Sequence, residues 1–286
     1  MAIVGVALLV RAITALQIAA LPLFRNPHFD SLEYLGWARR VAAGDFTWPA
    51  LPPHGPGYPY VLGALLAIFG GSLVAVVVGQ SIVGAMTCWL AARTTRALFG
   101  ARAGLAAGLI LAVYAPLIWI DASIVAEGLL IFTMTLALWS AATERHPALT
   151  GAILGLATLI RPTALILLPL FLFFGARTWR LRGVMAAVTI AVIAPVTIAN
   201  WRTSHAFIPV QAFGGINVYL GNSPLRDGLA SARPGADWER IEPEAARHGA
   251  DEERYFMRKT RQRYPWTLSV PIACPSRSIG TATMLR

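Results

Sequence analysis

The sequence has few charged residues, and this scarcity excludes most soluble protein classes. Of its 286 residues, 13% are charged and 56% are hydrophobic, whereas about 25% of a soluble domain is charged. The apolar residues form blocks that are nearly free of charge, most of them long enough to cross a bilayer core: Ile3–Phe24, Ser72–Ala92, Ala103–Ile120, Gly128–Ala142, Ala148–Gly175 and Val184–Asn200. Because a soluble core would give shorter, amphipathic runs, the sequence predicts an all-α, polytopic transmembrane helical bundle.

Motifs for nucleotide, thiol and metal chemistry are also absent. The chain has no Walker motif, no G-x-S-x-G and no G-x-G-x-x-G. Its two cysteines, Cys88 and Cys274, form neither a disulfide framework nor a metal-ligand spacing. We therefore predict no metal-binding residues, while a divalent cation stays open as a cofactor. The net charge is +10, but the arginines lie in short clusters between apolar blocks, so nucleic acid is not an expected partner.

The arginine clusters predict a topology. The run Tyr58–Phe69 would rise only about 18 Å as a helix, too little for a 30 Å core, so we expect it not to cross. Arg161–Pro162 interrupts the fifth block, and an arginine at the bilayer centre costs about 3 kcal/mol. We therefore expect two short helices that turn there on the outer side. The remaining clusters then face the cytoplasm, as the positive-inside rule requires: Arg93, Arg96, Arg102, Arg177, Arg180 and Arg182.

This topology divides the chain into three parts. Residues 1–201 are the predicted transmembrane domain, with an external loop over residues 25–57. Residues 202–268 contain turn-forming glycines and a stretch of alternating charges, which predicts an extracytoplasmic loop with an interfacial helix. Residues 269–286 are rich in Ser, Thr and Arg, and we expect a disordered tail.

The external loop contains the first candidate for chemistry. A helix is predicted from Asp30 to Ala43, with Gly44 just past its end. At 100° per residue, Asp30, Glu33, Tyr34 and Trp37 share one face, while Leu32, Leu35, Ala42 and Ala43 share the other. This pattern predicts an interfacial helix that presents a carboxylate and aromatics to an outer cavity. Asp30 is a catalyst or simply a helix cap, and the two roles are compatible.

Four other polar residues also have two interpretations each. Glu127 lies where a second external link begins a helix, six residues after Asp121, and is either a functional carboxylate or a cap. Arg161 and Arg11 either bind a lipid phosphate or extend toward the interface. His54 either lies in a loop that Pro and Gly merely shape or binds a metal or phosphate, for which it is by itself a weak signal. By topology, Asp30, His54 and Glu127 lie on the same side of the membrane.

Five short motifs follow one another along the chain. Asp30 is followed by Tyr34 and Ala38 at helical spacing. A proline-glycine-tyrosine turn, His54-Gly55-Pro56-Gly57-Tyr58-Pro59, precedes a short apolar helix that ends in Phe-Gly. Glu127 follows a small residue, Ala126. A G-L-A-x-L-x-R-P segment covers residues 155–162, and a G-G-x-N-x-Y-x-G-N-x-P segment covers residues 214–224.

In order and topology these motifs resemble the GT-C superfamily of membrane glycosyltransferases. The branch most similar to the chain is that of protein O-mannosyltransferases and aminoarabinose transferases, glycosyltransferase family 39. The resemblance covers about residues 1–265. Since members of this family continue with further spans, we expect the chain to be a truncated N-terminal part.

The resemblance implies an enzyme of the inner (plasma) membrane with an extracytoplasmic active face. It would transfer a glycosyl group, with inversion, from a polyprenyl-phosphate-linked sugar to an acceptor lipid, glycan or protein. Asp30 would be the general base, Glu127 the second catalytic carboxylate, and the substrate-binding residues would be Tyr34, His54, Tyr58, Arg161, Asn217 and Asn222. Two alternatives stay open, a truncated non-catalytic relative and a polytopic lipid or sugar transporter.

Overall fold

The computed structural model describes residues 2–19, 30–49, 52–143 and 146–212, and a few short stretches beyond them (214–215, 218–219, 244, 247 and 255–259). The described residues are helical and contain no strand. The chain forms two compact units, Met1–Phe213 and Gly214–Arg286. The predicted all-α helical fold is therefore confirmed for the part of the chain that the structure describes.

The first unit consists of ten α-helices and one 3-10 helix among its described residues. They are α1 (Ala2–Ala19), α3 (Asp30–Ala42), α4 (Gly57–Ile68), α5 (Leu73–Phe99), α6 (Ala101–Ala112), α7 (Ala115–Ala122), α8 (Glu127–Ala142), α9 (Pro147–Ile160), η1 (Pro162–Leu167), α10 (Leu168–Phe174) and α11 (Trp179–Ser204).

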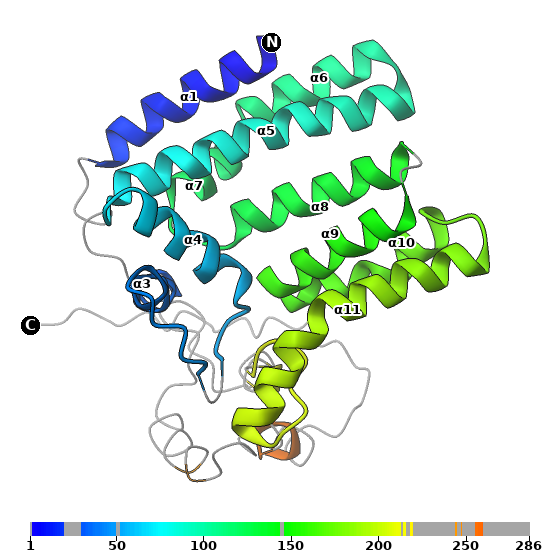
Figure 1. Cartoon of the computed structure of the whole chain (residues 1–286). Helices are drawn as coiled ribbons and strands as arrows, with labels where there is room; N and C mark the ends of the chain where they lie inside the picture. Colours follow the sequence, from blue (N-terminus) through cyan, green and yellow to red (C-terminus); the bar gives the residue numbers. More distant parts are fainter. Residues whose placement is uncertain are drawn as a thin grey trace, which may run out of the picture. The chain divides into compact units, whose positions relative to one another are not determined.

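Helices that follow one another in the chain, such as α5 with α6 and α8 with α9, run antiparallel (Figure 1), whereas the packed pairs α5–α8 and α9–α11 run parallel. The C-terminal ends of α5 and α8 lie at one end of the helical set, together with the N-terminal ends of α6, α9 and α11. The opposite end contains α3, α4 and the break between α7 and α8. The arginine clusters at residues 93–102 and 177–182 thus lie at the other end from Glu127 and Arg161, as the predicted topology requires.

Two helices, α5 and α11, are long and apolar enough to cross a membrane, and α6 with α7 would make a third span. The apolar block Ala103–Ile120, predicted as one span, is divided between α6 and α7. The chain bends by 53° between these two helices, and Pro116 lies in the first turn of α7, where its missing N–H is tolerated. Helix α4 has 12 residues, as predicted. That α4 does not cross the membrane stays a prediction.

The predicted break at Arg161–Pro162 is confirmed. Helix α9 ends at Ile160, Arg161 is extended, and Pro162 begins η1. The chain then returns along α9, because Phe171 of α10 packs in one apolar cluster with Ile153 and Leu154 of α9 and Met185 of α11. Pro162 lacks a backbone N–H and cannot continue the helix. The turn therefore has a local cause, which can be read from the sequence.

Helix α3 forms where predicted but buries a different face. Tyr34, Leu35 and Trp37 are all buried, and Leu32 is 57% exposed. The helix packs against α4, where a Cβ on Gly63 would lie 2.7 Å from a methyl carbon of Val41. The predicted division of faces was therefore wrong. Close packing against α4 buries aromatic and aliphatic residues of α3 together. On a helix that only lay at the membrane surface, these two kinds of residue would be on different faces.

The second unit has few described residues. The Tyr219 and Phe256 rings lie 5.6 Å apart, and both side chains are buried. Lys259 donates a hydrogen bond to Glu244 at 3.1 Å. The predicted partition into residues 1–201, 202–268 and 269–286 stays a prediction.

Candidate active site

The turn before α4 is held against the end of α9. A Cβ on Gly55 would clash with the carbonyl oxygen of Leu159, and one on Gly57 would lie 2.9 Å from the Ile160 side chain. Only glycine permits this close approach between two backbones. The contact brings His54, which precedes Gly55, to the end of α9 where Arg161 leaves the helix.

Glu127 and Arg161 meet in this region. Glu127 is the first residue of α8, and Arg161 directly follows α9. Arg161 Nη2 donates to Glu127 Oε1, and the two side chains are 29% and 37% exposed respectively. Within the described residues, Arg161 Nε is buried and has no hydrogen-bond partner. The pair is therefore open to solvent on one side and keeps one donor unused.

Tyr34 lies at the centre of the predicted site residues. Its ring centroid is 4.4 Å from that of His54 and 5.0 Å from that of Tyr58. Ala126 and Ile160, the neighbours of Glu127 and Arg161 in the chain, belong to the same buried cluster as Tyr34. Residues of α3, α4 and α9 and the residue that precedes α8 thus belong to one buried cluster around Tyr34.

The charges around Tyr34 also act on its hydroxyl group. Burial raises the pKa of Tyr34 to about 12, the positive charge of Arg161 opposes this rise, and the carboxylates of Glu127, Asp30 and Glu33 add to it. The phenol therefore keeps its proton at neutral pH and remains a hydrogen-bond donor. Since electrostatic interactions fall off with distance, these four charged groups share one neighbourhood.

The outermost polar contact joins α3 to the turn before α4. His54 Nε2 lies 2.9 Å from Glu33 Oε2, and the two side chains are 12% and 55% exposed respectively. Glu33 was missed as a site residue, although its spacing of three from Asp30 placed both on one helix face. Asp30 is exposed in the first turn of α3. The structure thus brings Tyr34, His54, Tyr58, Glu127 and Arg161 together, with Asp30 at the edge.

Two predicted residues, Asn217 and Asn222, lie outside the described residues. Among the described residues, no group of three or more His, Cys, Asp or Glu side chains is arranged to hold a metal ion. The chemistry of this region therefore depends on carboxylates, an imidazole, a phenol and a guanidinium.

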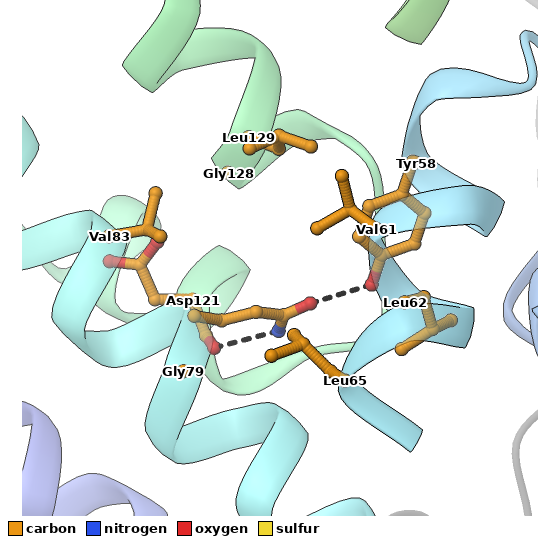
Figure 2. Close-up of a pocket in the computed structure, with 10 residues that line it drawn as sticks. Tyr58, Val61, Leu62, Leu65, Gly79, Val83, Asp121, Gly128 and Leu129 are labelled. Atoms are coloured by element: carbon orange, nitrogen blue, oxygen red, sulfur yellow. Dashed lines mark hydrogen bonds between the residues drawn. The ribbon is translucent and has the colours of Figure 1, made fainter. Parts of the chain in front are cut away.

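A small, partly open cavity lies next to the site, and the sequence did not predict it. A cavity of about 140 Å³ is lined by residues of α4, α5 and α8 and by Asp121 of α7. Most of its wall is aliphatic, with Val61, Leu65 and Leu129 among the lining residues (Figure 2). Tyr58 and Gln80 provide polar groups on the wall. Gln80 was overlooked, but a lone amide inside an apolar span is a recognisable signal.

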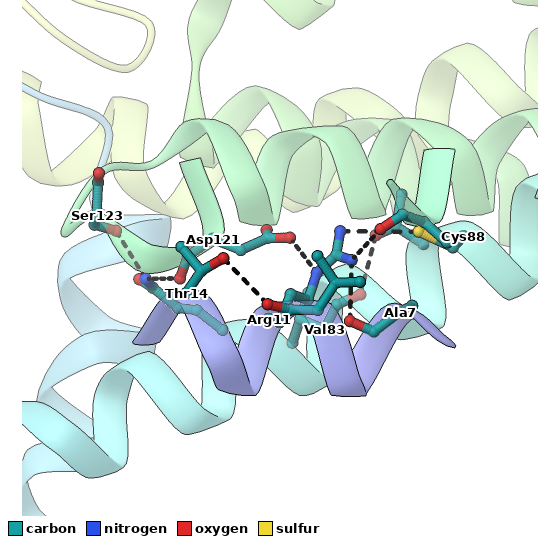
Figure 3. Close-up of polar contacts among 11 residues, drawn as sticks. Ala7, Arg11, Thr14, Val83, Cys88, Asp121 and Ser123 are labelled. Atoms are coloured by element: carbon teal, nitrogen blue, oxygen red, sulfur yellow. Dashed lines mark hydrogen bonds and ion pairs between the residues drawn. The ribbon is translucent and has the colours of Figure 1, made fainter. Parts of the chain in front are cut away.

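Arg11 occupies neither of its two predicted environments. Its Nε donates to Asp121 Oδ2 at 2.7 Å, and both side chains are 1% exposed. Its two Nη atoms reach the carbonyl oxygens of Ala7 and Ala112 and the sulfur of Cys88 (Figure 3). The guanidinium is satisfied by protein groups, so it neither extends toward an interface nor binds a lipid phosphate.

Comparison with known proteins gives one finding. A family model described as dolichyl-phosphate-mannose-protein mannosyltransferase matches residues 53–201, just over half of the chain. The match covers His54, Tyr58, Gln80, Glu127 and Arg161. No curated protein and no solved structure matches the chain.

Proposed function

The chain belongs to the dolichyl-phosphate-mannose-protein mannosyltransferase family, and we propose that it moves a glycosyl group from a polyprenyl-phosphate-linked sugar to an acceptor at the extracytoplasmic face of the plasma membrane. The family places the chain among membrane glycosyltransferases of the GT-C type. The proposal adds the donor, the side of the membrane, the inverting course and the residues that carry the reaction.

The unused donor of Arg161 carries this proposal. A transferred sugar leaves behind a phosphate whose negative charge grows as the bond to the sugar breaks. Arg161 Nε is buried without a hydrogen-bond partner among the described residues, and a guanidinium is the preferred partner of phosphate oxygens. The protonated Tyr34 hydroxyl lies within the influence of the same charge. Together they supply cationic and neutral donors for the departing phosphate.

The proposed transfer takes place in a single step. An acceptor oxygen or nitrogen attacks the anomeric carbon, a new bond to that carbon forms, and the bond between carbon and phosphate oxygen breaks with its electron pair on the phosphate. The acceptor proton moves to the carboxylate of Asp30, the proposed general base. Attack opposite the leaving group inverts the anomeric configuration. A divalent cation is compatible with this course but has no assigned ligands.

The adjacent cavity supports a lipid-linked donor. Its walls are mostly aliphatic, and they adjoin Tyr58, which contacts Tyr34. An apolar space beside phosphate-binding groups suits a molecule that has a hydrocarbon tail and a charged head. The acceptor stays unassigned between a lipid, a glycan and a protein.

Asp30→Asn tests the proposed base. The amide keeps the shape and the capping ability of the carboxylate but cannot accept a proton at neutral pH. We expect transfer to fall by about 10²-fold or more, with the unfolding temperature nearly unchanged. The measurement is the transfer of labelled mannose from polyprenyl-phosphate mannose in membranes that contain the full chain. Absence of transfer by the unmodified chain contradicts the proposed function, whereas an active Asp30→Asn variant contradicts only the choice of base.

The orientation is tested separately by cysteine labelling. Asp45 lies in the exposed loop after α3, at the same end of the unit as the site. We expect Asp45→Cys to react with a membrane-impermeant maleimide added outside intact cells. Reaction from the cytoplasmic side alone would place the site on the inner face and overturn the extracytoplasmic assignment.

A further inference from the structure

Gln80 is the one described side chain that bonds to both halves of the candidate site. One half consists of α3, α4 and the turn between them, with Tyr34, His54 and Tyr58. The other half is the link between α7 and α8, from which Glu127 emerges. Gln80 itself belongs to α5, the longest described helix of the unit.

The amide of Gln80 uses both of its ends. Its Oε1 accepts a hydrogen bond from the Tyr58 hydroxyl at 2.6 Å. Its Nε2 donates to the carbonyl oxygen of Asp121 at 3.0 Å and to that of Ser123 at 2.7 Å. The amide of Gln80 therefore lies between Tyr58 on one side and the end of α7 on the other. One side chain thus ties α4, α5 and the α7–α8 link together.

Each side of this connection leads to the site. The Tyr58 ring packs edge-on against that of Tyr34 at 5.0 Å, and the Tyr34 ring lies tilted against that of His54 at 4.4 Å. On the other side, Asp121 and Ser123 precede Glu127 by only a few residues, and a Cβ on Gly128 would lie 3.1 Å from Asp121 Oδ1. The Arg11–Asp121 ion pair holds the same helix end through its side chain. The link between α7 and α8 is thus held by Arg11 of α1 on one side and by Gln80 on the other.

We propose that Gln80 is a positioning residue of the transfer reaction, which sets Tyr58 and Tyr34 relative to Glu127 and Arg161. The inference rests on the proposed function. It does not require Gln80 to touch the substrate. A glutamine fits the role because it alone offers an acceptor and two N–H donors on one flexible stem of this length. A carboxylate would place an oxygen against two carbonyl oxygens, and a leucine would remove all three hydrogen bonds of the amide.

Two substitutions test this proposal in the full chain. Gln80→Asn keeps the amide but shortens its reach, and Gln80→Leu removes it. Both should lower kcat by up to about 10²-fold, the scale of a 1 Å misplacement. Gln17, an exposed glutamine on α1, provides the matched controls Gln17→Asn and Gln17→Leu, which should keep the unmodified kcat. Activities are taken per folded protein, from the monodisperse peak in size-exclusion chromatography.

Gln80→Glu adds a signature that a purely structural role would lack. When neutral, the carboxylic acid can accept from Tyr58 and donate to one carbonyl, whereas the carboxylate can only accept. The charged and titratable groups that surround this position are Tyr58, Asp121 and Arg11. We expect kcat of Gln80→Glu, relative to the unmodified chain, to rise as the pH is lowered. A ratio that is independent of pH, or unmodified kcat in Gln80→Asn and Gln80→Leu, would overturn the proposal.

A measurement without turnover separates this inference from the proposed function. Val61 of α4 and Leu129 of α8 line the same cavity. The paired variant Val61→Cys/Leu129→Cys reports on their approach through its rate of crosslinking by a short bifunctional maleimide. Adding Gln80→Leu should slow this crosslinking several-fold, whereas Gln17→Leu should not. An unchanged rate contradicts the positioning role even if the chain shows no transfer with polyprenyl-phosphate mannose.

Discussion

Two arginine–carboxylate pairs in the same helical unit differ in how completely the protein surrounds them. Arg11 and Asp121 are 1% exposed, and every nitrogen of Arg11 has a protein partner. Arg161 and Glu127 are partly exposed, and Arg161 Nε has no hydrogen-bond partner within the described residues. The enclosed pair has no free donor for a ligand, whereas the open pair has one. Similar residues therefore hold helices together in one place and, in the function that we propose, bind the substrate in the other.

The Arg11–Asp121 pair also tolerates fewer changes in the residues around it than the Arg161–Glu127 pair does. A Cβ on Gly84 would clash with the Asp121 carboxylate, so α5 must provide a glycine at this point. Two buried charges stabilise a fold only while each keeps its partner, because an unpaired buried charge is costly. The open pair is partly exposed to solvent, so the fold loses less stability when one of its members is changed.

The largest expected effect comes from breaking the enclosed pair. Arg11→Met leaves Asp121 buried without its cation, and should lower the free energy of unfolding by about 3–5 kcal/mol. The double variant Arg11→Met/Asp121→Leu removes both charges and should recover most of this loss. Thermal unfolding in detergent measures both, with the exposed Arg102→Met as control. If the single and double variants unfold alike, the pair is not what holds α1 to α7.

The next effect concerns the open pair and activity rather than stability. Arg161→Lys keeps the positive charge but removes Nε and the planar fork that binds two phosphate oxygens. We expect transfer to fall by about 10²-fold, as for the loss of one donor that stabilises developing charge. The unfolding temperature should hardly move, because a partly exposed pair contributes about 0–1 kcal/mol. Arg102→Lys is the matched control, and equal activity of the two variants would remove Arg161 from the reaction.

The smallest effect is a pH dependence beside the open pair. The pKa of Tyr34 is raised from 10 to about 12 by burial, so the folded state holds the phenol proton more tightly than the unfolded state. The stabilisation is complete below pH 10 and is lost as the pH rises through 12. Tyr34→Phe should therefore lose less stability than the unmodified chain between pH 10 and 12. Tyr114→Phe, at an exposed tyrosine, serves as control, and parallel curves would contradict the burial argument.

Local chemistry made several parts of the fold predictable. Pro162 follows the end of α9, the apolar run that forms α4 has only 12 residues, and Asp121 and Glu127 bracket the break between α7 and α8. The order of motifs also indicated the family. For the site, the sequence nominated Tyr34, His54, Tyr58, Glu127 and Arg161, and these residues do converge.

The sequence by itself determined where helices begin and break, because proline, glycine and charge act on their immediate neighbours in the chain. Only the tertiary structure decided which groups pair. Asp121 follows Arg11 by 110 residues, and nothing local distinguishes it from other carboxylates as the partner. The buried face of α3 and the role of Gln80 likewise arise from packing against α4 and α7. Pairing over long separations depends on which helix surfaces meet, and that is a property of the assembled unit.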